Sequence, residues 1–199
     1  MTEDARIPPF VYWISKAIVV TGLKVFLRWK VVGRENIPKS GPLLFGSNHI
    51  SNLDPIVIGA STNRQVRFMA KHELFKSPII GRFLQYFGAF SVRRGMQDTT
   101  AIRQAISIPH HGGCLVVFPE GSRSKTGEVG KGLPGVALIA RKANAPIVPV
   151  AIVGPYQWFK PLTVRFGQPL TPSPDDTNES LLEKLMTSIR QLKNAGHGA

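Results

Sequence analysis

Runs of consecutive apolar residues alternate along the chain with segments in which apolar residues recur every three or four positions. The runs are typical of buried β-strands, and the wider spacing is typical of helices that bury one face. The pattern predicts strands at Lys30–Gly33, Leu43–Ser47, Val66–Ala70, Ala89–Arg93, Cys114–Phe118, Ile147–Val153 and Leu162–Phe166. It predicts helices at Pro55–Ser61, Pro78–Phe87, Thr99–Ile108, Leu133–Ala143 and Glu179–Leu192. Because strands and helices alternate, we expect an α/β fold with a mixed, largely parallel sheet covered by helices.

Between Phe10 and Trp29 apolar residues, many of them aromatic, cover a broad arc of a helical wheel. The basic side chains of this segment gather within about half of the wheel: Lys16, Lys24, Arg28 and Lys30. We expect an amphipathic helix, or a helix pair bent at Gly22, that associates with the headgroup region of a membrane. The alternative is a helix docked on the domain's own core. The predicted division is an N-terminal membrane-associating segment at 1–32 and a second domain at 33–199.

The sequence lacks the run of roughly eighteen apolar residues that a membrane-spanning helix requires. Its longest uncharged stretches near the start, Ile7–Ser15 and Ala17–Leu23, are separated by Lys16, and no secretory signal is evident. We therefore expect membrane contact of a peripheral or monotopic kind.

Charge narrows the class of partner. The 199 residues include 25 lysines and arginines against 12 aspartates and glutamates, a formal net charge of +13. This excess favours an anionic partner: nucleic acid, an anionic membrane surface or a phosphorylated small molecule. The single cysteine, Cys114, excludes an internal disulfide and is compatible with a reducing cytosol.

The segment 48–55, Asn-His-Ile-Ser-Asn-Leu-Asp-Pro, follows a predicted strand and precedes a predicted helix. Pro55 suits the first helical position, which makes Asp54 a natural N-cap. A carboxylate five residues after His49 can also accept the ring N–H and leave the other nitrogen free to take a proton. The alternative is that Asp54 only caps the helix and His49 is a polar loop residue.

The segment 118–124, Phe-Pro-Glu-Gly-Ser-Arg-Ser, directly follows another predicted strand. Gly121 permits close approach of the backbone, Ser122 offers a hydroxyl and Arg123 offers a bidentate fork, so this strand end is a candidate phosphate cradle. The nucleotide-binding P-loop pattern is absent, and Lys131 extends a basic, glycine-rich loop beyond the segment. A generic surface turn would explain the glycines as well.

Further candidates lie on two other predicted strands. Arg93 and Arg94 stand where one strand ends, and because adjacent strand residues face opposite ways, at most one of them can point into a given pocket. Pro149 interrupts an apolar strand, where it marks an edge, a bulge or a contact with a ligand, or is simply structural.

These blocks, in this order, resemble the glycerophospholipid acyltransferase family, and within it the bacterial 1-acylglycerol-3-phosphate (lysophosphatidic acid) acyltransferases. The family's H-x4-D block matches His49–Asp54, and its F-P-E-G-[ST]-R-S block matches Phe118–Ser124 without a mismatch. The arginine block matches less tightly at Val92–Gly95, with Arg94 as the counterpart of the family arginine, and the V-P-[VI] block matches Val148–Val150. The resemblance covers roughly Trp29 to Gly167.

The resemblance implies an acyltransferase domain at 33–199 that acylates the free hydroxyl of 1-acylglycerol 3-phosphate and gives phosphatidic acid. His49 would be the general base and Asp54 would orient it. Arg123, with Arg94 and the backbone around Gly121, would grip the acceptor phosphate, while Glu120 orients that grip or contacts glycerol, and Ser122, Arg93 and Lys131 are weaker candidates. The acyl donor would be a thioester of CoA or acyl carrier protein. The enzyme would need no cofactor and would work at the cytoplasmic face of the cell membrane.

Other functions and some local details stay open. The acceptor could instead be glycerol 3-phosphate, another lysophospholipid or a glycolipid, and a basic nucleic-acid-binding protein is the alternative of another class. The scattered histidines indicate no metal site, and His110 and His111 are expected at an exposed helix end. Asp176 and Glu179 form a capping-box-like pair before the last predicted helix.

Overall fold

A seven-stranded sheet forms the centre of the molecule, with strands in the order β1-β7-β6-β2-β5-β3-β4. The structure, a computed structural model, describes residues 9–93 and 98–195. The strands are β1 (Lys30–Val32), β2 (Leu43–Ser47), β3 (Val66–Lys71), β4 (Ala89–Val92), β5 (Cys114–Val117), β6 (Ile147–Val153) and β7 (Thr163–Phe166). Only the β6–β7 pair is antiparallel among these neighbours. The expected mixed, largely parallel sheet is confirmed.

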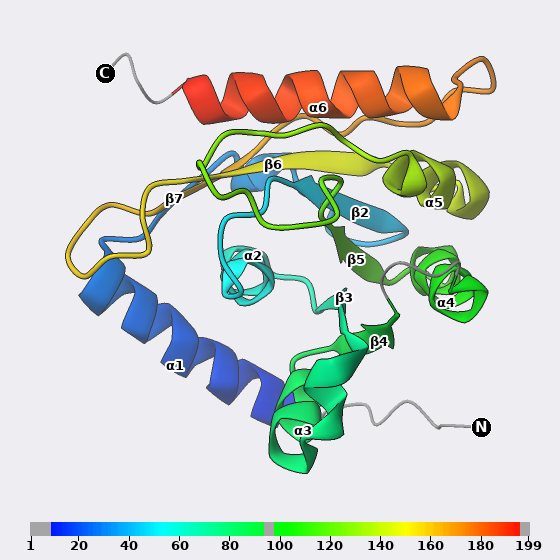
Figure 1. Cartoon of the computed structure of the whole chain (residues 1–199). Helices are drawn as coiled ribbons and strands as arrows, with labels where there is room; N and C mark the ends of the chain where they lie inside the picture. Colours follow the sequence, from blue (N-terminus) through cyan, green and yellow to red (C-terminus); the bar gives the residue numbers. More distant parts are fainter. Residues whose placement is uncertain (1–8, 94–97, 196–199) are drawn as a thin grey trace.

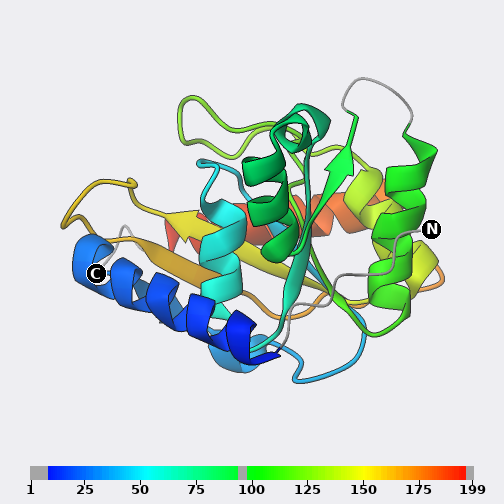
Figure 2. The ribbon, with the colours of Figure 1, turned by 90° about the horizontal axis from the view of Figure 1, so that it is seen from below.

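Helices cover both faces of this sheet (Figure 1). They are α1 (Pro9–Leu27), α2 (Asp54–Ser61), α3 (Pro78–Tyr86), α4 (Thr99–His110), α5 (Gly135–Ala143) and α6 (Asn178–Asn194), with short 3-10 turns at Arg34–Asn36 and His72–Lys76. In Figure 2, α1, α2 and α3 lie in front of the sheet and α6 lies behind it. The predicted helices and strands agree with these bounds to within two residues at each end.

Two apolar cores follow from the alternation of side chains along the strands. On one face of the sheet Phe45, Val150 and Phe166 are buried beneath α1, α2 and α3. On the other face Leu44, Leu115 and Ile147 are buried against α4, α5 and α6. Because the central strands β2, β5 and β6 are covered on both faces, they read in the sequence as nearly continuous apolar runs.

Helix α1 runs as one continuous helix through Gly22, so the single helix is observed and not the helix pair. Its Leu23 is buried in the core cluster, and Val19, Val20 and Leu27 pack against the same cluster. The opposite side exposes large apolar side chains: Phe10, Trp13, Ile14, Ile18, Val25 and Phe26. Helix α1 is therefore apolar on its docked side and on its exposed side.

Lys16 corrects the expected arrangement of basic residues on this helix. Its side chain is half-buried, and Nζ donates to the backbone carbonyl of Thr62 at the end of α2. Burial, followed by the nearby Arg34 charge, lowers the pKa of Lys16 to about 8. Lys24, Arg28 and Lys30 are exposed as expected. Lys16 thus fastens α1 to α2 instead of joining an outward-facing basic group.

The start of α6 also differs from the expectation. Thr177 is the N-cap, and it forms a capping box with Ser180: the Thr177 hydroxyl accepts from the Ser180 N–H at 3.1 Å, and the Ser180 hydroxyl accepts from the Thr177 N–H at 3.0 Å. The predicted Asp176–Glu179 pair was wrong, because Asp176 instead accepts from Lys184 Nζ at 2.7 Å. His110 and His111 lie at the exposed end of α4, as predicted.

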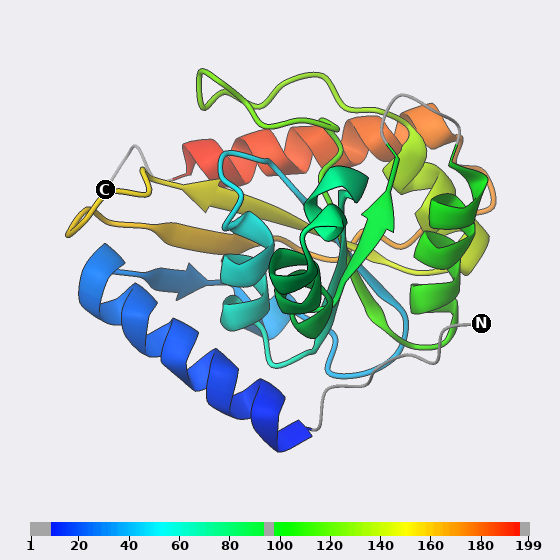
Figure 3. The same cartoon turned by 60° about the horizontal axis from the view of Figure 1, so that its bottom comes forward.

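Within the described residues, no helix combines the length and the hydropathy that crossing a bilayer requires. Exposed apolar side chains nevertheless extend beyond α1. Helix α3 presents Ile79, Ile80 and Phe83, and the loop between β6 and β7 presents Trp158 and Phe159. Both elements adjoin α1, through the 2.8 Å hydrogen bond between the Ser15 and Tyr86 hydroxyls and the Phe26–Trp158 ring contact at 5.0 Å. In Figure 3, α1 lies at the lower left, beside the strands β1, β7 and β6.

Candidate active site

The carboxyl ends of three neighbouring strands converge on one polar network. β2 is central and pairs in parallel with β6 on one side and β5 on the other. His49 follows β2, Glu120 follows β5 and Tyr156 follows β6. Because parallel strands end at the same edge of a sheet, side chains far apart in sequence meet here.

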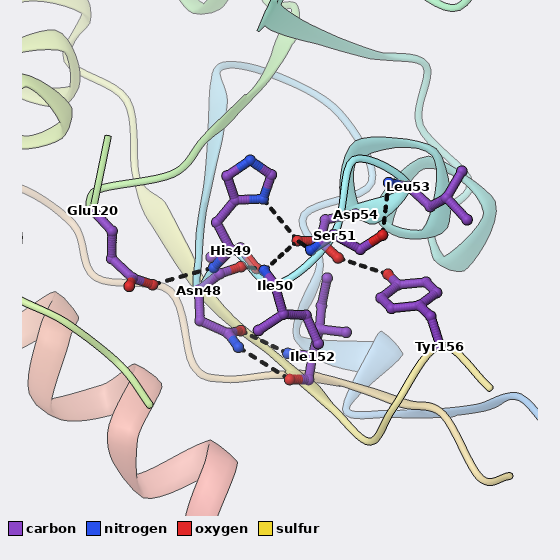
Figure 4. A network of polar contacts seen from close by, with 10 residues as sticks. Asn48, His49, Ile50, Ser51, Leu53, Asp54, Glu120, Ile152 and Tyr156 are labelled. Carbon is purple, nitrogen blue, oxygen red and sulfur yellow. Dashed lines mark hydrogen bonds and ion pairs between the residues drawn. The ribbon is translucent and has the colours of Figure 1, made fainter. Parts of the chain in front are cut away.

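His49 and Asp54 form the centre of this network (Figure 4). His49 Nδ1 lies 2.7 Å from Asp54 Oδ2, and the Asp54 side chain has no exposed surface. The same oxygen accepts the backbone N–H groups of Ile50 and Ser51 at 2.7 and 2.8 Å. A buried carboxylate can only accept, so Nδ1 carries the shared proton and Nε2 is the nitrogen left for chemistry.

The expectation that Asp54 is the N-cap of α2 was wrong. The helix begins at Asp54 itself, its N-cap position is Leu53, and no side chain caps it. The carboxylate instead turns back over the loop that it follows, where it fixes the backbone of Ile50 and Ser51. Asp54 therefore organises the loop that carries His49.

Tyr156 completes the surroundings of Asp54. Its hydroxyl donates to Asp54 Oδ1 at 2.7 Å, from the loop that follows β6. Burial, and then the negative charge of Asp54, raises the pKa of Tyr156, which keeps the hydroxyl protonated. This residue was not among those predicted from the sequence. Its position just after a predicted strand, in the segment Gly154-Pro155-Tyr156, was the available signal.

The His49 ring is held on its flat face as well as at Nδ1. It stacks on Phe118, with ring centroids 4.0 Å apart and planes inclined by 19°. The neighbouring Asn48 is fixed to β6 by two hydrogen bonds with the Ile152 backbone, at 3.0 and 2.8 Å. Nε2 lies on the far side of the ring from Asp54 (Figure 4).

Glu120 joins the His49 loop to the glycine-rich loop beyond β5. Oε1 accepts the backbone N–H of His49 at 3.1 Å, and Oε2 accepts the N–H of Gly130 at 3.0 Å. The backbone of Ser124 closes the contact by donating to the carbonyl oxygen of His49 at 2.8 Å. The Glu120 carboxylate therefore links the backbone of two loops, at His49 and at Gly130, and this contact is more specific than the expected role of orienting the phosphate grip or contacting glycerol.

The remaining residues of the predicted phosphate cradle lie on exposed backbone next to this network. Gly121 has φ +68°, and a Cβ there would lie 2.8 Å from Leu133, so the turn suits glycine. Ser122 and Arg123 are exposed, and their side chains have no hydrogen-bond partner among the described residues. Lys131 is exposed as well, on the wall of a cavity of about 690 Å³ between this loop and α6.

Two predicted site residues, Arg93 and Pro149, make no hydrogen bond with the His49–Asp54 pair. Arg93 is exposed at the end of β4, and β3 lies between β4 and β5. Arg94 lies outside the described residues. Pro149 is buried inside β6, not on an edge strand. Its carbonyl accepts from Gly167 just beyond the last β6–β7 pair, so its missing N–H falls where that ladder ends.

The described part of the chain provides neither a cluster of metal ligands nor a reactive thiol. No group of three or more histidine, cysteine, aspartate or glutamate side chains there could hold a metal ion. Cys114 is buried at the start of β5, and burial raises the pKa of its thiol to about 12. A thiol with that pKa is a poor nucleophile near neutral pH.

Comparison with known families identifies the matching part of the chain. The sequence model of the acyltransferase family matches residues 28–153, which include β1 to β6 and the two loops that carry His49 and Glu120. A 1-acyl-sn-glycerol-3-phosphate acyltransferase of Streptococcus pneumoniae is 30% identical over 191 residues, covering 86% of this chain and 70% of that protein.

Two further proteins extend the comparison. A chloroplastic 1-acyl-sn-glycerol-3-phosphate acyltransferase of Brassica napus is 29% identical, covering 73% of this chain. The chain spans only 43% of the length of that plant protein. The crystal structure of the 1-acyl-sn-glycerophosphate (LPA) acyltransferase PlsC from Thermotoga maritima is similar with a TM-score of 0.74 and 26% identity. That similarity covers 92% of this chain and 76% of the PlsC chain.

Proposed function

Because the chain belongs to the acyltransferase family, we propose that it transfers an acyl group from a thioester to the free hydroxyl of 1-acylglycerol 3-phosphate. The product of that reaction is phosphatidic acid. The observation that carries the proposal is the His49–Asp54 pair: a 2.7 Å contact to a fully buried carboxylate at the shared carboxyl edge of β6, β2 and β5. The names of the similar enzymes from Streptococcus pneumoniae and Thermotoga maritima support the choice of acceptor.

In the proposed mechanism His49 Nε2 takes the proton of the acceptor hydroxyl as its oxygen attacks the thioester carbonyl carbon. The tetrahedral intermediate collapses, the carbon–sulfur bond breaks, and the imidazolium returns the proton to the departing thiolate. Asp54 fixes the ring and stabilises its positive charge during these steps. General-base catalysis of this kind contributes roughly 10²- to 10⁴-fold. A thioester is already activated, so no protein nucleophile is needed and Cys114 has no role.

The acceptor phosphate is proposed to bind at the loop after β5. Arg123 is the primary ligand because its guanidinium is exposed and its backbone adjoins Ser124, which is hydrogen-bonded to His49. Gly121 lets the acceptor phosphate approach the backbone closely, and Ser122 offers a hydroxyl beside it. Lys131, Arg93 and Arg94 are proposed as secondary charges that attract anionic substrates, and Glu120 holds the loop in place.

The proposed working place is the cytoplasmic face of a membrane, where a lipid acceptor and a water-soluble thioester meet. Large apolar side chains are exposed on α1, on α3 and at Trp158 and Phe159. Lys24, Arg28 and Lys160 are exposed on or beside α1 and the β6–β7 loop. Each basic side chain near an anionic bilayer is worth about 1 kcal/mol, and the net charge of +13 acts in the same direction.

The identity of the acceptor is tested by offering purified protein a panel of lipids with radiolabelled acyl-CoA and, in parallel, acyl carrier protein. The panel contains 1-acylglycerol 3-phosphate, its 2-acyl isomer, glycerol 3-phosphate and a lysophospholipid with a larger headgroup. We expect the highest kcat/KM for 1-acylglycerol 3-phosphate. Preference for another acceptor would retain the acyl-transfer chemistry and reject the proposed substrate, and no transfer to any acceptor would reject the proposed function.

A further inference from the structure

The two oxygens of the Asp54 carboxylate accept different numbers of hydrogen bonds. Oδ2 accepts three hydrogen bonds, from His49 and from the backbone of Ile50 and Ser51. Oδ1 has a single partner among the described residues, the hydroxyl of Tyr156 at 2.7 Å. Since the Asp54 side chain is fully buried, this hydroxyl is what keeps Oδ1 from being an unsatisfied buried acceptor.

The loop between β6 and β7 is built to hold Tyr156 in this position. At its start Gly154 has φ +112°, and a Cβ there would lie 2.2 Å from the Pro161 carbonyl oxygen, so the two ends of the loop meet closely. The loop is also bonded to the end of α1, by the N–H of Phe159 to Phe26 and the N–H of Leu162 to Leu27, at 2.6 and 3.1 Å. The ring of Tyr156 packs against the core cluster beneath α1 and α2.

The direction of the Tyr156 bond is fixed by chemistry. The phenol is the donor because a carboxylate can only accept, and the raised pKa of Tyr156 keeps that proton in place wherever the enzyme would work. Two other titratable side chains lie near Asp54. His49 contacts Oδ2 directly, and Glu120 is more remote, because it accepts the backbone N–H of His49. The Tyr156 hydroxyl is therefore the neutral donor that balances Asp54 on the side opposite His49.

We infer that Tyr156 is a positioning residue for the His49–Asp54 pair, which it aligns by fixing Asp54 Oδ1. The segments that follow three strands then cooperate with the start of α2. The loop after β2 supplies the base, α2 supplies its carboxylate, Phe118 after β5 supplies the stacking ring, and Tyr156 after β6 anchors the carboxylate. The inference rests on the proposed function, since it assigns Tyr156 to the same reaction. Tyr156 itself does not touch the substrate.

The inference predicts a particular kinetic signature for Tyr156→Phe. A hydrogen bond to a charged group is lost, so we expect kcat to fall roughly tenfold or more, with KM for acceptor and donor unchanged within about twofold. Without the hydroxyl, less of the negative charge on Asp54 is neutralised and the imidazolium is stabilised. The acidic limb of the kcat/KM profile should therefore move to higher pH.

Tyr86→Phe is the matched control. It also removes a tyrosine hydroxyl that makes a 2.8 Å hydrogen bond, but this bond joins the last residue of α3 to Ser15 of α1 and does not involve Asp54. Both variants are assayed in mixed detergent micelles, so that vesicle binding does not limit the rate. Tyr86→Phe should keep the wild-type kcat and pH profile. A Tyr156→Phe enzyme with the wild-type kcat and pH profile would overturn the inference.

Proton NMR of the wild-type protein supplies a readout that does not depend on activity. We expect two slowly exchanging downfield protons, the Nδ1–H of His49 and the hydroxyl of Tyr156. The second should vanish and the first should shift in Tyr156→Phe, while Tyr86→Phe leaves both in place. Free exchange of the Tyr156 hydroxyl in the wild type would overturn the inference even if the variant failed to fold. If both protons are protected but the protein transfers no acyl group, the proposed function is rejected and the positioning of Asp54 by Tyr156 is retained.

Discussion

At the scale of single residues, the site depends on one carboxylate that performs two tasks. Asp54 orients the His49 ring, and it also holds the backbone of Ile50 and Ser51. These tasks place different demands on the side chain. Holding backbone requires only an acceptor oxygen, whereas stabilising an imidazolium requires a negative charge.

The two tasks separate in a comparison of Asp54→Asn with Asp54→Ala. The asparagine keeps an acceptor oxygen, so we expect it to fold while kcat falls roughly 10²- to 10⁴-fold. The alanine leaves the partly buried N–H groups of Ile50 and Ser51 and the hydroxyl of Tyr156 without their acceptor, and it should also lower the free energy of unfolding by about 3 kcal/mol. Urea denaturation and steady-state kinetics check both. Equal stability of the two variants would contradict the structural task.

Residue chemistry also sets what the sequence could reveal about the site. His49 and Asp54 lie five positions apart, so their pairing is readable from local spacing. Tyr156 lies 102 positions from Asp54, and Phe118 reaches His49 only because β5 and β2 are neighbours. The strand order that joins them is a property of the whole sheet and is not encoded in any short segment.

At the scale of elements, α1 is fastened to the domain by polar contacts as well as by apolar packing. Tyr12 donates to the Arg64 carbonyl at 3.3 Å, and Lys16 donates to that of Thr62. The wheel of α1 could not predict this, since apolar residues occupy both sides of the helix and leave the inward direction undetermined. The inward direction of Lys16 becomes visible only in the folded structure, where the helix packs against α2.

The lowered pKa of Lys16 gives α1 docking a pH dependence. The folded pKa of about 8 lies below the ordinary 10.5, so between these values the unfolded chain binds a proton that the folded chain has released. Stability contributed at this position therefore rises with pH across the window. We expect the free energy of unfolding of the wild type, relative to that of Lys16→Met, to increase as the pH rises from 8 to 10.5, as measured by urea denaturation. The opposing titration of Cys114 is common to both chains and cancels. A constant difference across the window would contradict this account.

Helix α6 provides a test of capping. Thr177→Ala removes one half of the capping box and should lower the free energy of unfolding by about 1 kcal/mol. Thr177→Ser keeps the hydroxyl and should lose much less. Thermal or urea denaturation separates the two. If Glu179→Ala were the more damaging change, the originally expected Asp176–Glu179 cap would be favoured over the observed one.

The elements themselves were largely predictable because their periodicities are strong. Strands buried on both faces appear as apolar runs, as at Leu43–Ser47 and Ile147–Val153, which match their predicted bounds. The caps were less predictable, since Asp54 and Asp176 each had several partners within reach. Which partner is chosen depends on tertiary contacts, with His49 and Tyr156 in one case and Lys184 in the other.

At the scale of the whole molecule, the positive charge and the exposed apolar side chains support one proposal, binding at a lipid surface. The outer side of α1 carries Trp13, Ile14 and Ile18, each about half exposed or more. Their removal from water into a bilayer interface would favour binding, since a fully buried apolar side chain is worth roughly 1.5–3 kcal/mol. Exposed lysines and arginines would add an electrostatic, salt-dependent part.

Vesicle flotation measures this directly. The triple variant Trp13→Ser, Ile14→Ser, Ile18→Ser should bind phosphatidylglycerol-containing vesicles roughly tenfold or more weakly than the wild type. Val32→Ser, which changes an exposed aliphatic side chain outside α1, α3 and the β6–β7 loop, is the control and should bind normally. Binding of the triple variant equal to that of the wild type would remove α1 from the proposed membrane contact.

The central claim is that His49 acts as a general base without a protein nucleophile. It is tested most directly by acyl transfer from acyl-CoA to 1-acylglycerol 3-phosphate in wild type, His49→Ala and Cys114→Ala, with circular dichroism to confirm folding. We predict that His49→Ala loses at least roughly 10²-fold in kcat while Cys114→Ala stays within about twofold of wild type. Near-normal transfer by a folded His49→Ala protein, or loss of transfer in a folded Cys114→Ala protein, would contradict the account.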